Sequence, residues 1–430
     1  MTCSSSLVKN KNVLMVAFHF PPCKGSSGIQ RTLSFCKNLA TQTAWDTHVL
    51  TANPSAYVAT SNEQMGDIPA KCSVIRSPCL DASRHLAVSG RYLQRTALPD
   101  NWSSWPLLGF FHGRRFIRKN GIDLLWSTYP IASAHKLASK LHKSTGIPWI
   151  ADFRDPMVEW DDVSGQWYPD NEHLRIARLR VESIVARYAE RTVFCTKSAR
   201  EIFLDRYKNF CPEKAHVISN GFDESIFSRV EAGGEATHAN RTRANTIRIL
   251  HSGTLYPGSD RGPEGFLTAV KKYLDTKDES LPTLKVVLRA TGFDLETEEI
   301  VNRLGLSDIV SIEQPIAYEA AIREMFEADI LLVIQGQTSN PAIPAKMYEY
   351  IRVGKPILAA VDEYGETLKL AKELGVTTWA NPTDVVALTK VIFEMAEHPR
   401  KPEYHWDRHR YSREFQAIQL AELMNLTARA

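Results

Sequence analysis

The sequence predicts an α/β protein of two domains, each built around a parallel β-sheet. The chain has 430 residues, which is long for a single hydrophobic core. Short apolar segments alternate with segments of helical length almost throughout, and this alternation is typical of βαβ units. One stretch, 230–245, has no apolar period and is rich in Gly, Ala, Thr, Asn and charged residues, so it predicts a linker between the two domains.

The first domain is expected to span residues 1–229. Its expected strands are 12–18, 47–50, 73–75, 122–126, 148–151, 192–195 and 216–218. Its expected helices are one that carries Leu33, Phe35, Cys36 and Leu39, then a basic helix at 110–119, and helices at 132–143 and 172–190. Strands separated by helices of these lengths predict a parallel sheet.

After a linker at 230–246, the second domain is expected to span 247–402. Its expected strands are 247–251, 284–288, 309–312, 330–334 and a buried strand after Gly354; its expected helices lie near 266–274, 298–304 and 322–326. The remainder, 403–430, contains a last helix at 411–424, and its packing partner cannot be read from the sequence.

Composition excludes several classes of protein. Hydrophobic residues make up 43% of the chain and charged residues 23%, which is typical of a soluble globular enzyme. The net charge of +3 is too small to indicate nucleic-acid binding. No apolar run reaches the roughly 18–20 residues that cross a bilayer, and the apolar stretch 13–20 is expected to be a strand and not a signal peptide. A cytoplasmic protein is expected.

Cysteine and histidine spacing indicates neither a disulfide framework nor a metal site. The seven cysteines are scattered and include no Cys-x-x-Cys pair. There is no Asp-x-Asp or His-Glu-x-x-His motif. His405 and His409 have metal-ligand spacing, but Arg408 and Arg410 beside them would repel a cation, so a surface pair is the simpler interpretation. No metal or other cofactor is expected.

The most informative segment is Asn-Pro-Ala-Ile-Pro-Ala-Lys-Met-Tyr-Glu-Tyr at 340–350. Pro344 suits a first helical position, where its missing N–H has no intrahelical partner. Lys346 and Glu349 leave the same face of that helix. A helix start that follows a strand can bind a diphosphate, and a carboxylate beyond it can hold a ribose hydroxyl. The alternative interpretation is a surface ion pair between the two side chains.

Three strand-end loops of the first domain carry residues suited to ligand binding, because ligands of open α/β sheets lie at the carboxyl ends of strands. The loop 18–31 contains glycines that allow close backbone approach, although it equally fits a plain turn. The loop 126–130 leads to His135, which either contacts a ligand or packs in the first turn of a helix. The third loop, Asp152-Phe-Arg-Asp155, suits sugar hydroxyls and phosphate, or an internal salt bridge.

The second domain offers a comparable loop at 251–256, where small residues let a diphosphate approach the backbone. Arg261 follows in the same loop, as a ligand contact or a solvated side chain. Near the hinge, Asn220-Gly221 is a turn signal.

The order of these motifs along the chain resembles the retaining glycosyltransferases of family 4. The resemblance rests on Phe-Pro-Pro with glycines, Ser-Thr-x-Pro, Pro-Trp-Ile-Ala-Asp-Phe-Arg-Asp, Asn-Gly-Phe-Asp, and Pro-Ala-Lys-Met-Tyr-Glu-Tyr with Gly-Lys-Pro-Ile. It implies the GT-B fold, in which two Rossmann-like domains face each other across a cleft and a C-terminal helix returns to the first domain. It also implies a nucleotide diphosphate sugar as donor in the second domain, a saccharide or lipid-linked acceptor in the first, retention of anomeric configuration, and no need for a metal.

Residue by residue, the resemblance assigns the ribose to Glu349 and the diphosphate to Lys346, with Arg261 as a further cation. His135 and Asp152 are implied as polar contacts at the sugar or acceptor. The expected catalytic residues are therefore His135, Asp152, Arg261 and Lys346. The expected donor-binding residues are Gly253, Thr254, Arg261, Ile343, Pro344, Ala345, Lys346 and Glu349, and the expected acceptor or cleft residues are Gly25, Gly28, Gln30, Thr128, His135 and Arg154.

The chain departs from the family at Pro341, where many members carry the first of two glutamates. The sugar contact that this glutamate makes in other members is then either made by backbone amides at 342–345 or absent. A glycosyltransferase of surface polysaccharide assembly is expected, with a nucleotide-sugar 2-epimerase and a catalytically silent binding protein as alternatives. The basic helix 110–119 either contacts an anionic membrane or simply covers the sheet.

Overall fold

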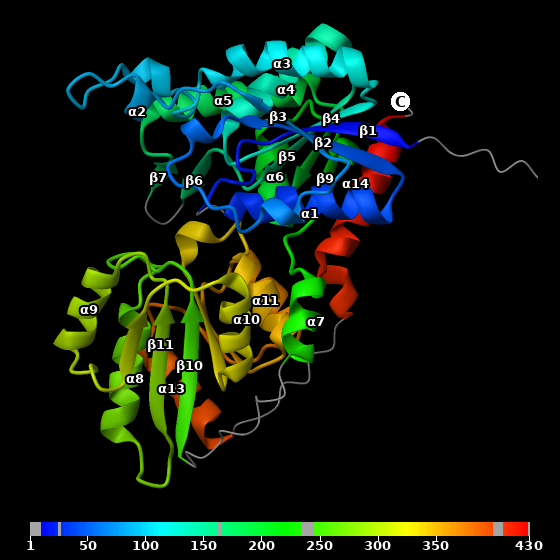
Figure 1. The fold of residues 1–430 in the computed structure, drawn as a ribbon. Helices are drawn as coiled ribbons and strands as arrows, with labels where there is room; N and C mark the ends of the chain where they lie inside the picture. Colours follow the sequence, from blue (N-terminus) through cyan, green and yellow to red (C-terminus); the bar gives the residue numbers. More distant parts are fainter. Residues whose placement is uncertain (1–9, 25–26, 162–164, 234–244, 399–406, 429–430) are drawn as a thin grey trace, which may run out of the picture. The chain divides into compact units, whose positions relative to one another are not determined.

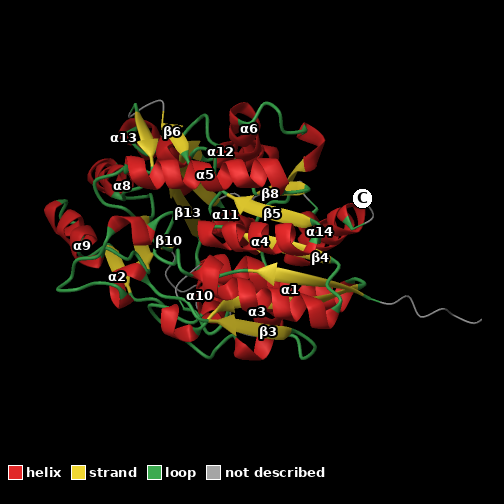
Figure 2. Cartoon of the chain, turned by 90° about the horizontal axis from the view of Figure 1, so that it is seen from above, coloured by secondary structure: helices red, strands yellow, loops and turns green. Residues whose placement is uncertain are grey.

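The computed structural model of the chain describes residues 10–24, 27–161, 165–233, 245–398 and 407–428. It contains two compact units, the first formed by 1–220 with 413–430 and the second by 221–412. Each unit is a parallel sheet with helices on both faces (Figures 1 and 2). The two-domain α/β prediction is confirmed.

The sheet of the first unit has the strand order β3-β2-β1-β4-β5-β8-β9. Its strands are β1 (Lys11–Val16), β2 (Trp45–Ala52), β3 (Ser73–Ser77), β4 (Leu124–Thr128), β5 (Trp149–Arg154), β8 (Arg191–Phe194) and β9 (Ala215–Val217). Its helices are α1 (Ser27–Gln42), α2 (Ala82–His85), α3 (Trp105–Asn120), α4 (Ala132–Thr145), α5 (Glu172–Tyr188), α6 (Lys197–Arg206) and α14 (Arg413–Thr427). A small antiparallel hairpin, β6 (Glu159–Asp161) and β7 (Gln166–Tyr168), was not anticipated from the sequence.

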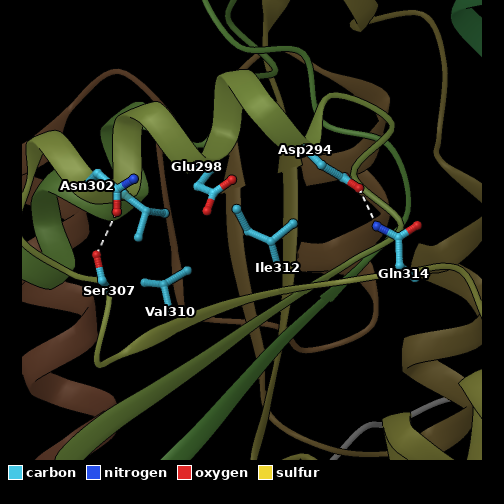
Figure 3. A pocket seen from close by; sticks show the side chains of 8 residues that line it. Asp294, Glu298, Asn302, Ser307, Val310, Ile312 and Gln314 are labelled. Carbon is cyan, nitrogen blue, oxygen red and sulfur yellow. Dashed lines mark hydrogen bonds between the residues drawn. The ribbon is translucent and has the colours of Figure 1, made fainter.

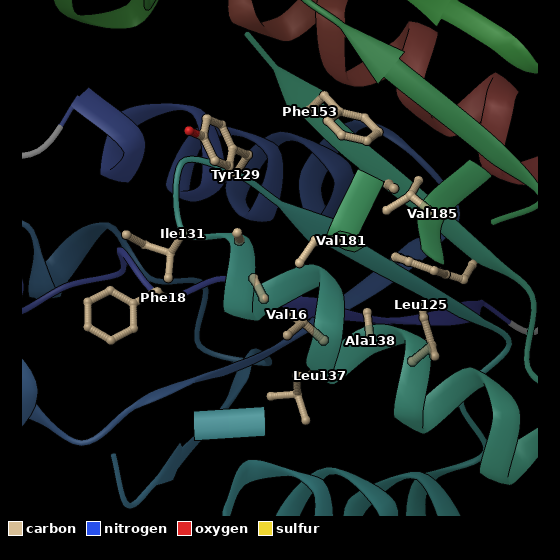
Figure 4. Packing of buried hydrophobic residues seen from close by; sticks show 14 of the residues in the cluster. Val16, Phe18, Leu125, Tyr129, Ile131, Leu137, Ala138, Phe153, Val181 and Val185 are labelled. Atoms are coloured by element: carbon tan, nitrogen blue, oxygen red, sulfur yellow. The ribbon is translucent and has the colours of Figure 1, made fainter. Parts of the chain in front are cut away.

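Two apolar layers hold the first sheet between its helices. On one face α3, α4 and α5 pack over the sheet; Val16 and Leu125 of neighbouring strands meet Leu137 of α4 in this layer (Figure 4). On the other face α1 and α14 lie together under the sheet (Figure 1). Leu420 and Met424 of α14 are fully buried there. The C-terminal helix therefore returns to the first unit, as the family resemblance implied.

The sheet of the second unit has the order β12-β11-β10-β13-β14-β15. Its strands are β10 (Thr246–Ser252), β11 (Thr283–Arg289), β12 (Val310–Glu313), β13 (Ile330–Gln335), β14 (Ile357–Val361) and β15 (Trp379–Ala380). Its helices are α7 (Glu224–Ala232), α8 (Glu264–Thr276), α9 (Asp294–Arg303), α10 (Tyr318–Glu327), α11 (Ala345–Val353), α12 (Glu366–Glu373) and α13 (Val385–Glu397). Because β10 and β13 are parallel neighbours, the loops at their carboxyl ends lie side by side.

The boundary between the units differs from the expected one. The sequence placed 221–229 in the first domain and began a linker at 230, whereas α7 belongs to the second unit. Phe227 and Val230 of α7 are buried in that unit's core, and Arg352 of α11 forms ion pairs with Glu224 and Glu231 at 2.6 Å. These contacts fix α7 to the second unit, so the N-terminal segment of the first unit ends at Asn220.

The C-terminal boundary of the second unit also differs from the expected one. The expected boundary at 402/403 falls outside the described residues, and the second unit continues to Ser412. Tyr411 packs against Tyr348 of α11, with ring centroids 5.6 Å apart. The returning helix therefore begins at Arg413. Most of the predicted linker, 234–244, also lies outside the described residues.

Candidate functional site

The carboxyl ends of β10 and β13 and the start of α11 bring several predicted residues together in the second unit. Lys346, in the first turn of α11, reaches back to β10, and its Nζ lies 2.8 Å from Nε2 of His251. Gly253 follows β10 with φ +117°, and a Cβ there would come within 3.0 Å of the Lys346 Nζ. The backbone conformation therefore favours glycine here, and any larger residue would also make a tight contact with the lysine side chain.

The environment of Lys346 makes its charge unusual. Burial, with a smaller contribution from the positive charge of Arg261, lowers the pKa of Lys346 to about 7, and Glu349 acts in the opposite direction. A buried ammonium without a bound carboxylate is costly, so such a group is ready to pair with an anion. Lys346 is thus a cation suited to a ligand phosphate.

Glu349 lies one turn further along α11 and is 9% exposed. The hydroxyl of Tyr318 in α10 donates to Glu349 Oε1 at 2.7 Å. The expected surface ion pair between Lys346 and Glu349 is absent from the described contacts: Lys346 meets His251, and Glu349 meets Tyr318. The carboxylate is therefore held in place by the fold and not by the lysine.

Arg261 lies in the loop that joins β10 to α8. Its guanidinium stacks over the Tyr256 ring, 4.4 Å from the centroid. The neighbouring Asp260 ties this loop to the one after β13, because Thr338 donates from its backbone N at 2.7 Å and from its hydroxyl at 2.8 Å. A Cβ at Gly336 would overlap Asp260. These contacts fix the loop that carries Arg261.

The segment around Pro341 is also fixed by hydrogen bonds. Asn340 donates from its side chain to Asp362 at 2.9 Å, and the Gln335 amide donates to the carbonyl of Ala342 at 2.8 Å. Pro344 is the N-cap of α11, one position before the expected one, and provides no side-chain cap. Among the described hydrogen bonds the Met347 amide donates to the Pro344 carbonyl, and the amides of Ala345 and Lys346, which have no acceptor there, remain available to an anion. The predicted Ile343 is half-buried against the core, and Thr254 is exposed.

The first unit treats its predicted residues differently. Asp152, at the end of β5, is fully buried, and Arg31 of α1 binds both of its oxygens at 3.0 Å. Thr128 adds a third hydrogen bond at 2.8 Å. Arg31 also donates to the carbonyl oxygens of Ile218 and Ser219. Asp152 and Thr128 therefore take part in a hydrogen-bond network inside the first unit, and the expected ligand contact by Asp152 stays a prediction.

His135 is likewise enclosed in the core. It is fully buried, its Nδ1 lies 2.7 Å from the Ser127 hydroxyl, and its ring packs against Phe153. Burial lowers the pKa of His135 to about 3, with a small opposing effect from Asp152. These contacts agree with the packing interpretation of His135. Its Nε2 has no hydrogen-bond partner among the described residues, and the ligand interpretation stays a prediction.

Other predicted residues of the first unit have mixed outcomes. Arg154 ends β5 with φ +63° and is 7% exposed. It does not hold Asp152, which Arg31 holds instead. Its charge acts on Asp155 and His19: burial raises the pKa of Asp155 while Arg154 opposes the rise, and burial together with Arg154 lowers the pKa of His19 to about 4. Arg154 therefore stays a candidate ligand contact.

Two further predicted residues serve α1 and α14. Gln30 accepts a hydrogen bond from Arg413 at 3.3 Å, and the carbonyl of Gly28 accepts one from Thr32. Gly25 lies outside the described residues.

Sequence reasoning missed four residues that organise these sites: Arg31, His251, Asp260 and Tyr318. Each is far in sequence from its partner; Arg31 and Asp152, for example, are 121 positions apart. The local signal for Arg31 is that it follows a glycine-containing loop and has no acidic residue near it in the sequence.

A separate pocket lies between α9 and the end of β12 (Figure 3). Asp294, Glu298 and Gln314 are among the residues that line it, and Gln314 donates to Asp294 at 2.8 Å. None of the predicted site residues lines this pocket. Among the described residues, no group of three or more His, Cys, Asp and Glu side chains is arranged to hold a metal.

Comparison with solved structures defines the class of fold. Sucrose-phosphate synthase from Thermosynechococcus elongatus aligns with a TM-score of 0.66 at 16% identity, over 98% of this chain and 100% of that one. Anabaena HepE in complex with UDP and glucose aligns with a TM-score of 0.63 at 15% identity, over 97% and 100%. UDP-GlcNAc 2-epimerase from Neisseria meningitidis bound to UDP-GlcNAc aligns with a TM-score of 0.59 at 13% identity, over 96% and 99%. The chain has the GT-B fold.

The family match is narrower than the fold match. Residues 70–226 match Glycosyltransferase Family 4, which confirms the resemblance over that region. No curated protein sequence matches the chain. The chain therefore has the GT-B fold and a region, 70–226, that is similar to Glycosyltransferase Family 4.

Proposed function

We propose that the chain is a retaining, metal-independent glycosyltransferase that moves a hexose-type sugar from a nucleotide diphosphate sugar to a saccharide or lipid-linked acceptor. The observation that carries this proposal is the site of Lys346, Arg261 and Glu349 at the start of α11. The complex of HepE with UDP and glucose makes UDP the first nucleotide to test.

The chemistry follows from the charges of the site. Cleavage of a nucleotide sugar develops negative charge on the leaving diphosphate, and groups already directed at that charge stabilise the transition state. The Lys346 ammonium, the Arg261 guanidinium and the first amides of α11 supply this stabilisation. Glu349, oriented by Tyr318, holds a ribose hydroxyl and so fixes the diphosphate against Lys346. Because Pro341 cannot hydrogen-bond the donor sugar as a glutamate would, the backbone around 342–345 contacts the sugar.

The acceptor is proposed to bind to the first unit. Asp152 and His135 are buried in the core, and the polar side chains at the strand ends also include Arg154, Asp155 and His19. Burial holds His19 neutral, and it comes from the loop whose glycines were predicted to approach a ligand. Assembly of a surface polysaccharide, such as exopolysaccharide, capsule or O-antigen, is the setting that such an acceptor suits.

Contact with the inner face of the cytoplasmic membrane is part of this proposal. Gly109, Gly113 and Ile117 of α3 are buried, so α3 does cover the sheet. Its opposite face exposes Leu107 and Phe111, by 58% and 64%, beside basic residues of the same helix. An exposed apolar and basic face suits an anionic membrane surface. No helix in the described part of the chain is long and apolar enough to span a bilayer.

The test is incubation with UDP-sugars in the presence and absence of lipid-linked and saccharide acceptors. Transfer to an acceptor, with retained anomeric configuration by NMR and with EDTA present, is the expected result. Conversion of the donor to its epimer without any acceptor would contradict the transferase proposal and identify a 2-epimerase. Nucleotide binding without turnover under every acceptor would identify a silent binding protein.

A further inference from the structure

The contact between Lys346 and His251 is an unusual pairing for a lysine. The described hydrogen-bond partner of Lys346 is a histidine and not a carboxylate: its Nζ lies 2.8 Å from the imidazole Nε2 of His251. His251 is fully buried, and its Nδ1 has no hydrogen-bond partner in the described structure. The backbone of Gly253 lies against the lysine side chain, because a Cβ at that position would be 3.3 Å from the Lys346 Cε.

The groups that face Lys346 come from three segments of the second unit. His251 is on β10; burial, together with the charge of Lys346, lowers its pKa well below the ordinary value, so it stays neutral. Arg261, in the loop after β10, repels the ammonium, and Glu349 on α11 attracts it. The Tyr350 hydroxyl accepts the Ser252 amide at 2.9 Å, and burial, its main influence, raises the pKa of Tyr350. Lys346 is half-buried, so the attraction of one carboxylate is opposed by one arginine and by partial removal from water.

We propose that His251 positions Lys346 so that the lysine takes up a proton when a nucleoside diphosphate binds. The imidazole can accept a hydrogen bond from the ammonium or donate one to the neutral amine, so it holds Nζ in the same place in both states. Without ligand, burial and Arg261 favour the amine. A diphosphate adds negative charge beside Nζ and favours the ammonium.

This inference rests on the proposed function, since it assumes that the diphosphate lies at Lys346. It adds a consequence that the proposed function alone does not carry. Burial lowers the pKa of the free lysine to about 7, so above that pH the ligand must bind together with a proton. Affinity should then fall as pH rises above 7, by up to about tenfold per pH unit, until the pKa of the bound lysine is reached.

The experiment is isothermal titration of UDP at pH 8 in two buffers with different ionisation enthalpies. UDP is fully ionised at this pH, so its own protonation does not contribute. Wild-type protein is expected to take up about one proton per UDP, because a lysine with a pKa near 7 is mostly neutral in the free site. Lys346→Arg is expected to bind UDP with no uptake, because the guanidinium is always charged. The matched control is Lys369→Arg on the exposed face of α12, which should behave as wild type.

His251→Gln tests the positioning role. The amide oxygen of glutamine can accept from the ammonium but cannot exchange donor and acceptor roles at that atom, so proton uptake and the pH dependence of UDP affinity should both decrease. The melting temperature of each variant without UDP shows whether the fold is intact. If His251→Gln does not fold, the comparison of wild type with Lys346→Arg still decides whether Lys346 is the group that binds the proton.

The outcomes separate the two proposals. UDP binding by wild type without proton uptake at pH 8 would overturn this inference and leave the proposed function standing. Uptake that survives in Lys346→Arg would also overturn it, because another group would then bind the proton. A folded His251→Gln with unchanged uptake and pH profile would remove His251 from the positioning role. Absence of binding by UDP, GDP and ADP alike would overturn the proposed function and this inference with it.

Discussion

The strand ends of the two units carry similar residues but use them in opposite ways. In the first unit the Asp152 carboxylate accepts three hydrogen bonds from Arg31 and Thr128 and is fully buried. In the second unit the described hydrogen bond of Lys346 is to a neutral imidazole, and Glu349 uses one oxygen for Tyr318. A charged side chain whose hydrogen bonds are all satisfied inside the protein stabilises the fold. One that lacks a partner of opposite charge is the better candidate for ligand binding.

Removal of Arg31 should have the largest effect on the fold. Arg31→Met leaves Asp152 charged and buried without its partner, so the free energy of unfolding should fall by about 3–5 kcal/mol. Denaturant unfolding measures the change. Lys208→Met removes an ion pair with Asp205 whose two side chains are 73% and 74% exposed, and it serves as the matched control. Equal effects of the two substitutions would show that the buried Arg31–Asp152 pair contributes no more to stability than an exposed ion pair.

Removal of Glu349 should act on the ligand and leave the fold almost unchanged. A hydrogen bond to a carboxylate contributes about 1.5–3 kcal/mol, so Glu349→Ala should weaken UDP binding by about 10- to 150-fold. The cost without ligand is the Tyr318 hydrogen bond, about 1 kcal/mol. Titration calorimetry and the melting temperature without UDP separate these effects. Glu373→Ala, at an exposed position on α12, is the control. A collapse of the unliganded fold with unchanged UDP affinity would make Glu349 a structural residue.

The buried His135 predicts a pH dependence of stability. Burial lowers its pKa from the ordinary value of 6.5 to about 3 in the folded protein, so the unfolded chain binds a proton that the folded one excludes. Stability should therefore decrease as pH falls below 6.5. Between pH 7 and 5, His135→Gln should lose about 2 kcal/mol less than wild type in denaturant unfolding. His19 and His216 also have lowered pKa values, but they remain in both proteins and cancel in the comparison. Identical pH profiles would place His135 in contact with solvent.

The smallest expected effect concerns the exposed face of α3. Phe111→Ser should weaken binding to vesicles that contain phosphatidylglycerol by about 5- to 30-fold, since one exposed aromatic side chain contributes about 1–2 kcal/mol to membrane burial. Vesicle sedimentation measures it. Ile176→Ser on α5, where the side chain is 39% exposed, is the control. Equal binding by wild type to neutral and anionic vesicles would contradict the charge part of the proposal.

The sequence predicted the fold well because alternation of apolar and helical segments is a local signal. The strands on either side of α11, the start of that helix near Pro344 and its end at Gly354 all follow from neighbouring residues. The return of α14 to the first unit was expected only from the family resemblance and not from its own residues, because its contacts with α1 join segments that are far apart in the chain.

Site residues were predicted less evenly, for the same physical reason. The residue types at 346 and 349 indicated a ligand site, yet only the fold shows that Lys346 meets His251 and not Glu349. In the first unit, the Asp-Phe-Arg-Asp motif suggested that Arg154 pairs with the aspartates, whereas Arg31 from α1 binds Asp152. Whether a polar residue is enclosed depends on helices packed from elsewhere in the chain, and no local pattern contains that information.

One measurement tests the central claim most directly: the affinity of UDP for Lys346→Met and for Arg154→Met, by titration calorimetry at pH 7. The account predicts that Lys346→Met binds at least about tenfold more weakly, because a charge-assisted contact to the diphosphate is lost. It predicts that Arg154→Met, at the strand end of the first unit, binds UDP as wild type does. Unchanged affinity for Lys346→Met with a large loss for Arg154→Met would contradict the account, because the nucleotide would then bind to the first unit.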